Sequence, residues 1–121
     1  MNVAIVRGCL SRPPEERVLP SGDRLVALEV TVPHPGRRAE GVPVVWPDAP
    51  ESILRLDVGD EVVAVGRVRR RFFRAGQSTQ SRTEVVAEAV APVRQRKRVL
   101  ALVERTVARL EEEAATAAEA G

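Results

Sequence analysis

The segment from Glu61 to Phe73 limits the possible folds of this 121-residue chain more than any other segment. It is apolar in its first half and alternates with a period of two in its second half, as the successive side chains of a β-strand do. One face carries Val62, Ala64, Gly66 and Val68, and the other carries Arg67, Arg69, Arg71 and Phe73. The segment therefore predicts a long strand with one face toward a core and a cationic face that ends in an aromatic ring.

Short apolar runs separated by turn residues predict the remaining strands. We expect them at residues 2–10, continued after a break by 15–19, and at 25–32, 42–46 and 83–93. Residues 20–23 predict a hairpin turn, while residues 33–41 and 75–81 are polar and predict surface loops, the first with a basic tip. Pro50 and Gly59 bracket one short helix. Three strands, a helix and two strands follow the order of an all-β, five-stranded OB barrel.

The chain changes period after residue 93. Six residues recur on one face of a helix of about six turns: Val99, Leu102, Val103, Thr106, Val107 and Leu110. Basic residues begin this helix and acidic residues end it, which opposes the helix macrodipole, so packing should hold it more than propensity does. We divide the chain into a barrel domain, 1–93, and an amphipathic helix, 94–121. We expect the helix to dock on another subunit; the alternative is that it folds back over its own barrel.

Composition excludes several classes of function. Cys9 is the only cysteine and His34 the only histidine, so the chain can build neither a disulfide nor a cysteine-based zinc site. Because no motif for nucleotide binding or hydrolysis is present, we expect no enzymatic activity, metal or cofactor. No stretch approaches 18 consecutive apolar residues, and no charged leader begins the chain, so we expect a cytoplasmic protein without membrane contact.

Positive charge is concentrated although the net charge is only +2. Five of the eight residues from Arg67 to Arg74 are arginine. A guanidinium group can hold a phosphate in a bidentate fork and can stack on a base. This stripe indicates a nucleic-acid partner, with a solvated strand face as the alternative.

Motifs in one order and register over residues 1–93 resemble those of the bacterial single-stranded DNA-binding protein family. They are Asn2-Val3 with Gly8 and Leu10, then Pro14-Glu15-x-Arg17 and Pro20-Ser-Gly22, then Leu56-x-x-Gly59-x-x-Val62-x-x-x-Gly66-x-x-Arg69-x-Arg71, and finally Thr83-Glu84-Val85-Val86. The resemblance implies an OB-fold protein that binds single-stranded DNA without sequence preference in replication, recombination or repair. It also implies a homo-oligomer, a tetramer or dimer, associated with the nucleoid.

The resemblance further implies a set of DNA-binding residues. Phe73 takes the position of an aromatic that stacks on a base, and Phe72 should face the core or the barrel rim. Trp46 ends the third strand where the family carries an aromatic; it either stacks on a base or caps the core beneath the short helix. Phosphates would bind Arg67, Arg69 and Arg71, with loop clamps at Arg37, Arg38, Arg74 and Arg82.

Two departures from the family bear on DNA binding and on recruitment of other proteins. Two further stacking tryptophans have no counterpart, since their places fall near Gly36 and Glu40. Each stacked base contributes roughly 1–3 kcal/mol, so binding should lean on arginine. We also do not expect the acidic-hydrophobic tip by which the family recruits other proteins, nor recruitment by that route. The alternative function is an oligomeric OB-fold interaction module with weak or lost DNA binding.

Overall fold

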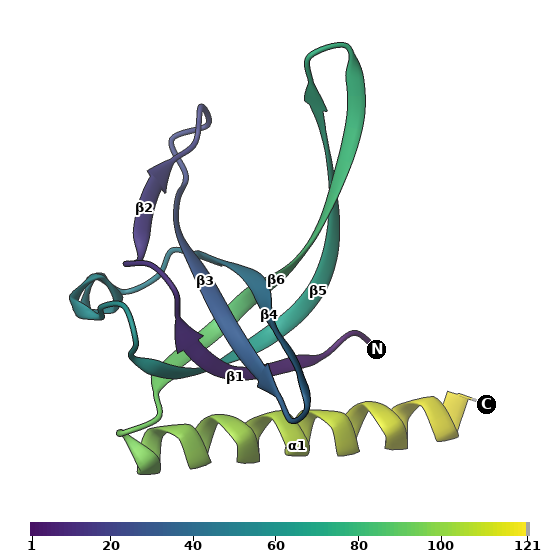
Figure 1. The fold of residues 1–121 in the computed structure, drawn as a ribbon. Coiled ribbons are helices and arrows are strands. Elements are labelled where there is room, and N and C mark those ends of the chain that lie inside the picture. Colours follow the sequence, from purple (N-terminus) through teal and green to yellow (C-terminus); the bar gives the residue numbers. More distant parts are fainter. Residues whose placement is uncertain (121) are drawn as a thin grey trace.

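Six β-strands, a 3-10 helix and a long α-helix make up residues 1–120, the part of the chain that the computed structural model describes (Figure 1). The strands are β1 (Ala4–Leu10), β2 (Glu15–Val18), β3 (Arg24–His34), β4 (Arg37–Pro47), β5 (Glu61–Ala75) and β6 (Ser78–Pro92). The 3-10 helix η1 spans Glu51–Arg55, and the α-helix α1 spans Arg96–Ala120. Gly121, which the sequence analysis includes in the helical segment, lies outside the described residues.

Five strands close into a barrel because β1 pairs with a different neighbour at each end. Most of β1 runs antiparallel to β5, and its last residues, Cys9 and Leu10, pair with Thr31 and Val30 of β3. The ring continues through β5, β6, β4 and β3, with β4 and β6 parallel at Val44 and Val85. The short strand β2 extends the sheet beside β3. The expected five-stranded barrel, with a short helical element before β5 and a C-terminal helix, is confirmed.

Alternate residues of these strands fill the barrel interior. Val26, Leu28 and Val30 of β3 are buried there with Val62 and Ala64 of β5. Each is separated from the next on its strand by one residue that points outward, as a pleated strand requires. The period-two reading of β5 is therefore confirmed for the part of the strand inside the barrel.

The helix expected between residues 47 and 58 is a single 3-10 turn. η1 follows Pro50, and Leu56 returns to extended backbone, with its amide donating to the carbonyl of Ile53. Only Ile53 of the turn is buried. Five residues are too few to offset the cost of nucleating an α-helix, whereas a 3-10 turn suits this length.

The two expected loops are tight hairpins, so both loop predictions are wrong. Strand β3 runs to His34 and β4 begins at Arg37, with Gly36 at φ +71° in the turn. Strand β5 runs to Ala75 and β6 begins at Ser78, with Gly76 at φ +65°. A two-residue turn needs positive φ, which glycine adopts without strain. The polar residues on either side belong to exposed strands, and composition alone does not separate these from loops.

The hairpin of β5 and β6 rises from the barrel as a two-stranded ribbon (Figure 1). At its base the pairing shifts register, because Val65 pairs with Ala89 and Gly66 with Ala87. Glu88 is therefore an extra residue of β6, which is a β-bulge. Bulges bend a strand and increase its twist, and here the bulge lies where the ribbon leaves the barrel.

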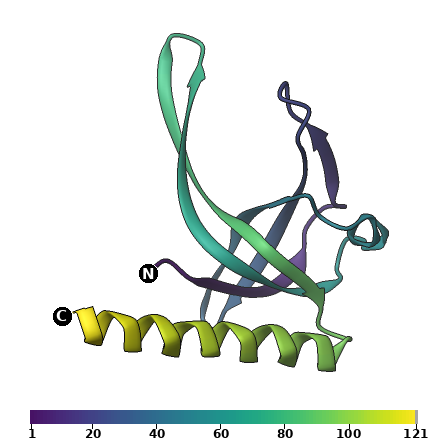
Figure 2. The ribbon, with the colours of Figure 1, turned by 180° about the vertical axis from the view of Figure 1, so that it is seen from behind.

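Helix α1 lies along the outside of its own barrel (Figures 1 and 2). Leu102 is buried against Val63, Val65 and Ala91, the outward residues of β5 and β6 at their barrel ends. The expectation that the whole apolar stripe docks on another subunit is therefore wrong for this part of it. The helix packs on a continuous apolar face of the barrel. This face was not predicted because it combines residues of two strands, β5 and β6, that lie apart in the sequence. Within residues 1–120, no helix is both long enough and apolar enough to cross a membrane.

Candidate nucleic-acid interface

A groove of about 230 Å³ lies between the β5–β6 hairpin and the outer face of β2, β3 and β4. Figure 1 shows the β5–β6 hairpin and the hairpin of β2 and β3 as two upright parts of the molecule. Its polar lining includes four arginines and three glutamates: Arg12, Arg17, Arg71, Arg82, Glu15, Glu29 and Glu84. The groove therefore combines cationic side chains with acidic side chains that partly neutralise their charge.

Glu84 of β6 holds two of the predicted phosphate-binding arginines. Its side chain is only 2% exposed, and its Oε1 accepts from Nη2 of Arg69 at 2.7 Å and lies 3.2 Å from Nε of Arg71. The guanidinium carbon of Arg71 also lies 5.2 Å from the ring centre of Phe73, within cation–π range. Burying a carboxylate is costly unless it is paired. Glu84 therefore keeps both arginines beside it, and in this trio of Glu84, Arg69 and Arg71 both guanidinium groups have a fixed direction.

Glu84 was not among the functional residues predicted from the sequence. Its position opposite Arg69 depends on the register between β5 and β6, which the bulge at Glu88 sets. The signal available in the sequence was a glutamate next to Val85 and Val86 in a mostly apolar run.

Other groove arginines are also ion-paired. Arg82 lies 3.7 Å from Glu29 and Arg17 lies 3.2 Å from Glu15. Arg12 pairs with no carboxylate of residues 1–120. The groove thus carries a small positive excess, not a strongly basic track.

The opposite face of the hairpin carries a second aromatic and cationic row. Phe72 is 66% exposed, so the expectation that it faces the core or the rim is wrong. Its face continues the interior side of β5, but the strand has already left the barrel at that point and no core remains for the ring to enter. Arg70 and Arg74 share this face and are exposed, whereas Phe73 on the groove side is half-buried.

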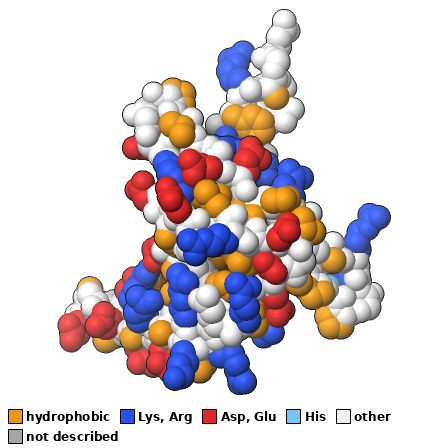
Figure 3. All heavy atoms as spheres, turned by 90° about the vertical axis from the view of Figure 1, so that its left-hand side faces the viewer, with side chains coloured by type: hydrophobic (Ala, Val, Ile, Leu, Met, Phe, Trp, Pro, Cys, Tyr) orange, Lys and Arg blue, Asp and Glu red, His pale blue; other side chains and the backbone are white. Residues whose placement is uncertain are grey.

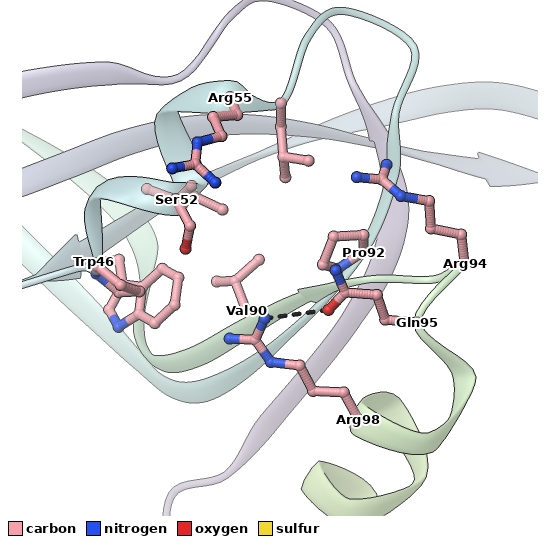
Figure 4. Close-up of a pocket in the computed structure, with 11 residues that line it drawn as sticks. Trp46, Ser52, Arg55, Val90, Pro92, Arg94, Gln95 and Arg98 are labelled. Carbon is pink, nitrogen blue, oxygen red and sulfur yellow. Dashed lines mark hydrogen bonds between the residues drawn. The ribbon is translucent and has the colours of Figure 1, made fainter.

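Trp46 lies in the core and is 7% exposed. Of the two readings that the sequence left open, this position corresponds to capping the core beneath η1. One edge of Trp46 lines a separate hollow of about 120 Å³ between η1 and the start of α1 (Figure 4). Arg55, Arg94 and Arg98 reach this hollow from three segments, and Arg98 donates to Oε1 of Gln95 at 3.2 Å.

Cationic side chains are unevenly spread on this side of the molecule. Figure 3 shows Lys and Arg gathered over the lower half of the face, near η1 and the start of α1, and acids interspersed with arginines above. The hollow can accept an anion, but it shares no lining residue with the groove.

The remaining predicted residues are not all near the groove. Arg67 is exposed on the same face of β5 as Arg69. Arg37 and Arg38 begin β4 at the turn of the β3–β4 hairpin and line neither the groove nor the hollow. Among residues 1–120, no three His, Cys, Asp or Glu side chains are grouped to hold a metal ion.

A closed five-stranded barrel with this strand order and a groove on its outer face defines an OB-fold protein. The single-stranded DNA-binding protein of Deinococcus radiodurans is 34% identical to the chain over 77 residues, which are 56% of this chain and 26% of that protein. A deletion mutant of the single-stranded DNA binding protein from Thermus aquaticus has a crystal structure that superimposes with a TM-score of 0.62 and 25% identity. That match covers 76% of this chain and 40% of the other.

These two matches confirm the resemblance seen in the sequence: the chain has an OB fold and is similar to single-stranded DNA-binding proteins over its barrel. No family model matches it. The chain spans only 26% of the length of the Deinococcus protein, so the activity and partners of that whole protein are not assigned by the match.

Proposed function

We propose that this protein binds single-stranded DNA without sequence preference and has no enzymatic activity of its own. The observation that carries the proposal is the row Arg69, Arg71 and Phe73, whose central residue lines the groove. Unstacked DNA offers phosphates to guanidinium groups and bases to aromatic rings. The names of the two relatives support the same ligand. We place the protein in replication, recombination or repair, as a homo-oligomer in the cytoplasm at the nucleoid.

The buried Glu84 gives the arginine pair a defined role. Because one carboxylate oxygen holds both guanidinium groups, their remaining N–H donors are fixed in direction before DNA arrives. Nε of Arg69 is buried and has no hydrogen-bond partner within the described chain, so it is not among the donors that DNA can reach. Donors that are already held in place lose less side-chain entropy on binding. This saving offsets part of the attraction to phosphate that is lost because Glu84 neutralises one positive charge.

A second candidate function is an interaction module with weak DNA binding. Three of the four groove arginines are already paired with glutamates, and Trp46 has little exposed ring for stacking. Titration of a fluorescent oligo-dT at several salt concentrations separates the two functions. DNA binding predicts an affinity that falls linearly with salt on logarithmic axes, whereas the module predicts no saturable signal.

Changing Arg69 and Arg71 together to alanine is expected to weaken oligo-dT binding and to reduce the salt slope by about 0.7 for each phosphate that is no longer neutralised. The matched control is Arg7→Ala with Arg109→Ala. These arginines are also paired with carboxylates, at 3.2 and 2.6 Å, but lie outside the groove. An equal loss in the control would show that net charge, not the groove, governs binding.

Phe73→Ala is expected to reduce affinity for oligo-dT by about 1–3 kcal/mol while the melting temperature changes little. Its ring lies on the groove side of the hairpin, beside Arg71. Phe72→Ala removes a ring of equal size from the other face of the same hairpin and should have a smaller effect. If Phe72→Ala causes the larger loss, the strand follows the outer side of the hairpin instead.

A further inference from the structure

Helix α1 extends beyond the surface that its own barrel offers. Thr106 is buried, and Arg109 makes the last ion pair to the barrel, with its Nη1 donating to Oε2 of Glu88 at 2.6 Å. This hydrogen bond and the charge of Glu88 raise the pKa of Arg109 above its ordinary value. Every residue from 111 to 120 is exposed. Half of the helix is therefore held rigidly in place, and the other half projects along the same axis (Figure 2).

A second apolar row follows the helix beside the one that contacts the barrel. Its members are separated alternately by three and four residues, the spacing of the a and d positions of a coiled coil: Leu100, Val103, Val107, Leu110, Ala114 and Ala117. We call this row the exposed seam. Leu100 is 58% exposed and Val107 is 44% exposed, so the barrel leaves this part of the seam uncovered. Further along, Ala114 and Ala117 are exposed and line an open hollow with Met1.

The charges along α1 complement those of a second, reversed copy. Arg94 precedes the helix, Arg96, Lys97 and Arg98 lie in its first turn, and Glu111, Glu112 and Glu113 lie in its second half. A parallel pair would place like charges side by side, whereas an antiparallel pair places each basic end beside the acidic segment of the other helix. When Leu100 meets Leu110 and Val103 meets Val107 of the second copy, Lys97 lies at the level of Glu113 of that copy.

We propose that the exposed seam binds the same seam of a second copy of this protein, with the two α1 helices antiparallel about a two-fold axis. Such a contact is self-complementary, as two-fold interfaces must be. The seam is short for an isolated coiled coil, but the barrel already holds the helix in place and so reduces the ordering cost of association. The contact uses none of the residues that line the groove, so both grooves of the dimer stay open. This inference does not depend on DNA binding.

The test is the mass of the intact protein by sedimentation velocity over a wide range of concentration. The wild type should reach the mass of a dimer or of a multiple of it, and Leu100→Glu with Val107→Glu should weaken self-association by at least about tenfold. Ala101→Glu with Ala108→Glu adds the same charge at the same spacing on an exposed face of α1 away from the seam, and should still associate. Because all four substituted residues are exposed, both variants should remain folded, with the circular dichroism spectrum of the wild type. A monomeric wild type, or a seam variant that associates as the wild type does, would overturn the proposal.

Orientation is tested by cross-linking in a Cys9→Ser background, since Cys9 is exposed. Leu100→Cys protein mixed with Leu110→Cys protein should form a disulfide-linked pair on oxidation, and neither variant should do so alone. Efficient linkage within Leu100→Cys alone would indicate parallel helices and overturn the antiparallel arrangement.

Discussion

Replacing Gly66 with alanine is expected to lower the free energy of unfolding by roughly 3 kcal/mol, the upper part of the usual range for overpacking. A Cβ atom at this position would lie 2.0 Å from the carbonyl oxygen of Val86 and 2.8 Å from the Cα of Ala87. Both atoms belong to the backbone of β6, so no side-chain rotation can make room. The two strands would have to separate at the bulge, where the hairpin leaves the barrel.

Gly41→Ala is the matched control for this substitution. Its new Cβ would meet Oε1 of Glu29 at 2.8 Å, but that atom ends a flexible side chain and can move away. Unfolding can be followed by the emission of Trp46, the only tryptophan of the chain and a core residue. We expect the melting temperature to fall on the order of 10 °C for Gly66→Ala and far less for Gly41→Ala. Similar losses in both variants would contradict the role of the backbone contact.

Glu84→Gln is expected to destabilise the protein and, in the molecules that remain folded, to tighten binding of single-stranded DNA. The amide is neutral and leaves Arg69 and Arg71 without the carboxylate that both now share. We expect a loss of about 1–3 kcal/mol in unfolding free energy, because the carboxylate is buried while both arginines are partly hydrated. The net charge of the trio rises from +1 to +2, so the salt slope of oligo-dT binding should steepen by about 0.7 if one more phosphate is engaged.

The control for this prediction is Glu61→Gln. Glu61 also pairs with an arginine, Arg7, but both side chains are exposed and outside the groove. This variant should change neither stability nor the salt slope appreciably. If Glu84→Gln instead weakens binding by folded protein, the carboxylate acts mainly by orienting the arginines, and its neutralising effect is secondary.

The alternation within β5 was sufficient to predict the row of Arg67, Arg69, Arg71 and Phe73, because strand geometry alone decides which residues share a face. The position of Glu84 could not be predicted in this way. It lies on a different strand, and one extra residue at the bulge determines which side chain of β6 faces Arg69. The same limit applies to Trp46, since β4 is too weakly patterned for its inward face to be read from sequence.

Exposure of Phe72 has a related cause. Alternation places it on the interior face of β5, but the sequence does not say where the strand leaves the barrel and that face meets water. For the helix the limit was different. Its apolar stripe was predicted from the sequence, but the surface that it contacts is the outer face of β5 and β6, which is assembled only by folding.

The β5–β6 hairpin and the barrel beneath it differ in local stability. Every residue from 70 to 83 is exposed or half-buried, and two strands without a third neighbour are marginal in water. Amide hydrogens of this ribbon should therefore exchange with solvent through local opening, at a free energy well below that of global unfolding. A DNA strand lying in the groove would hold the ribbon closed, so its arrival would slow exchange at the hairpin amides while those of the barrel core stayed governed by global unfolding.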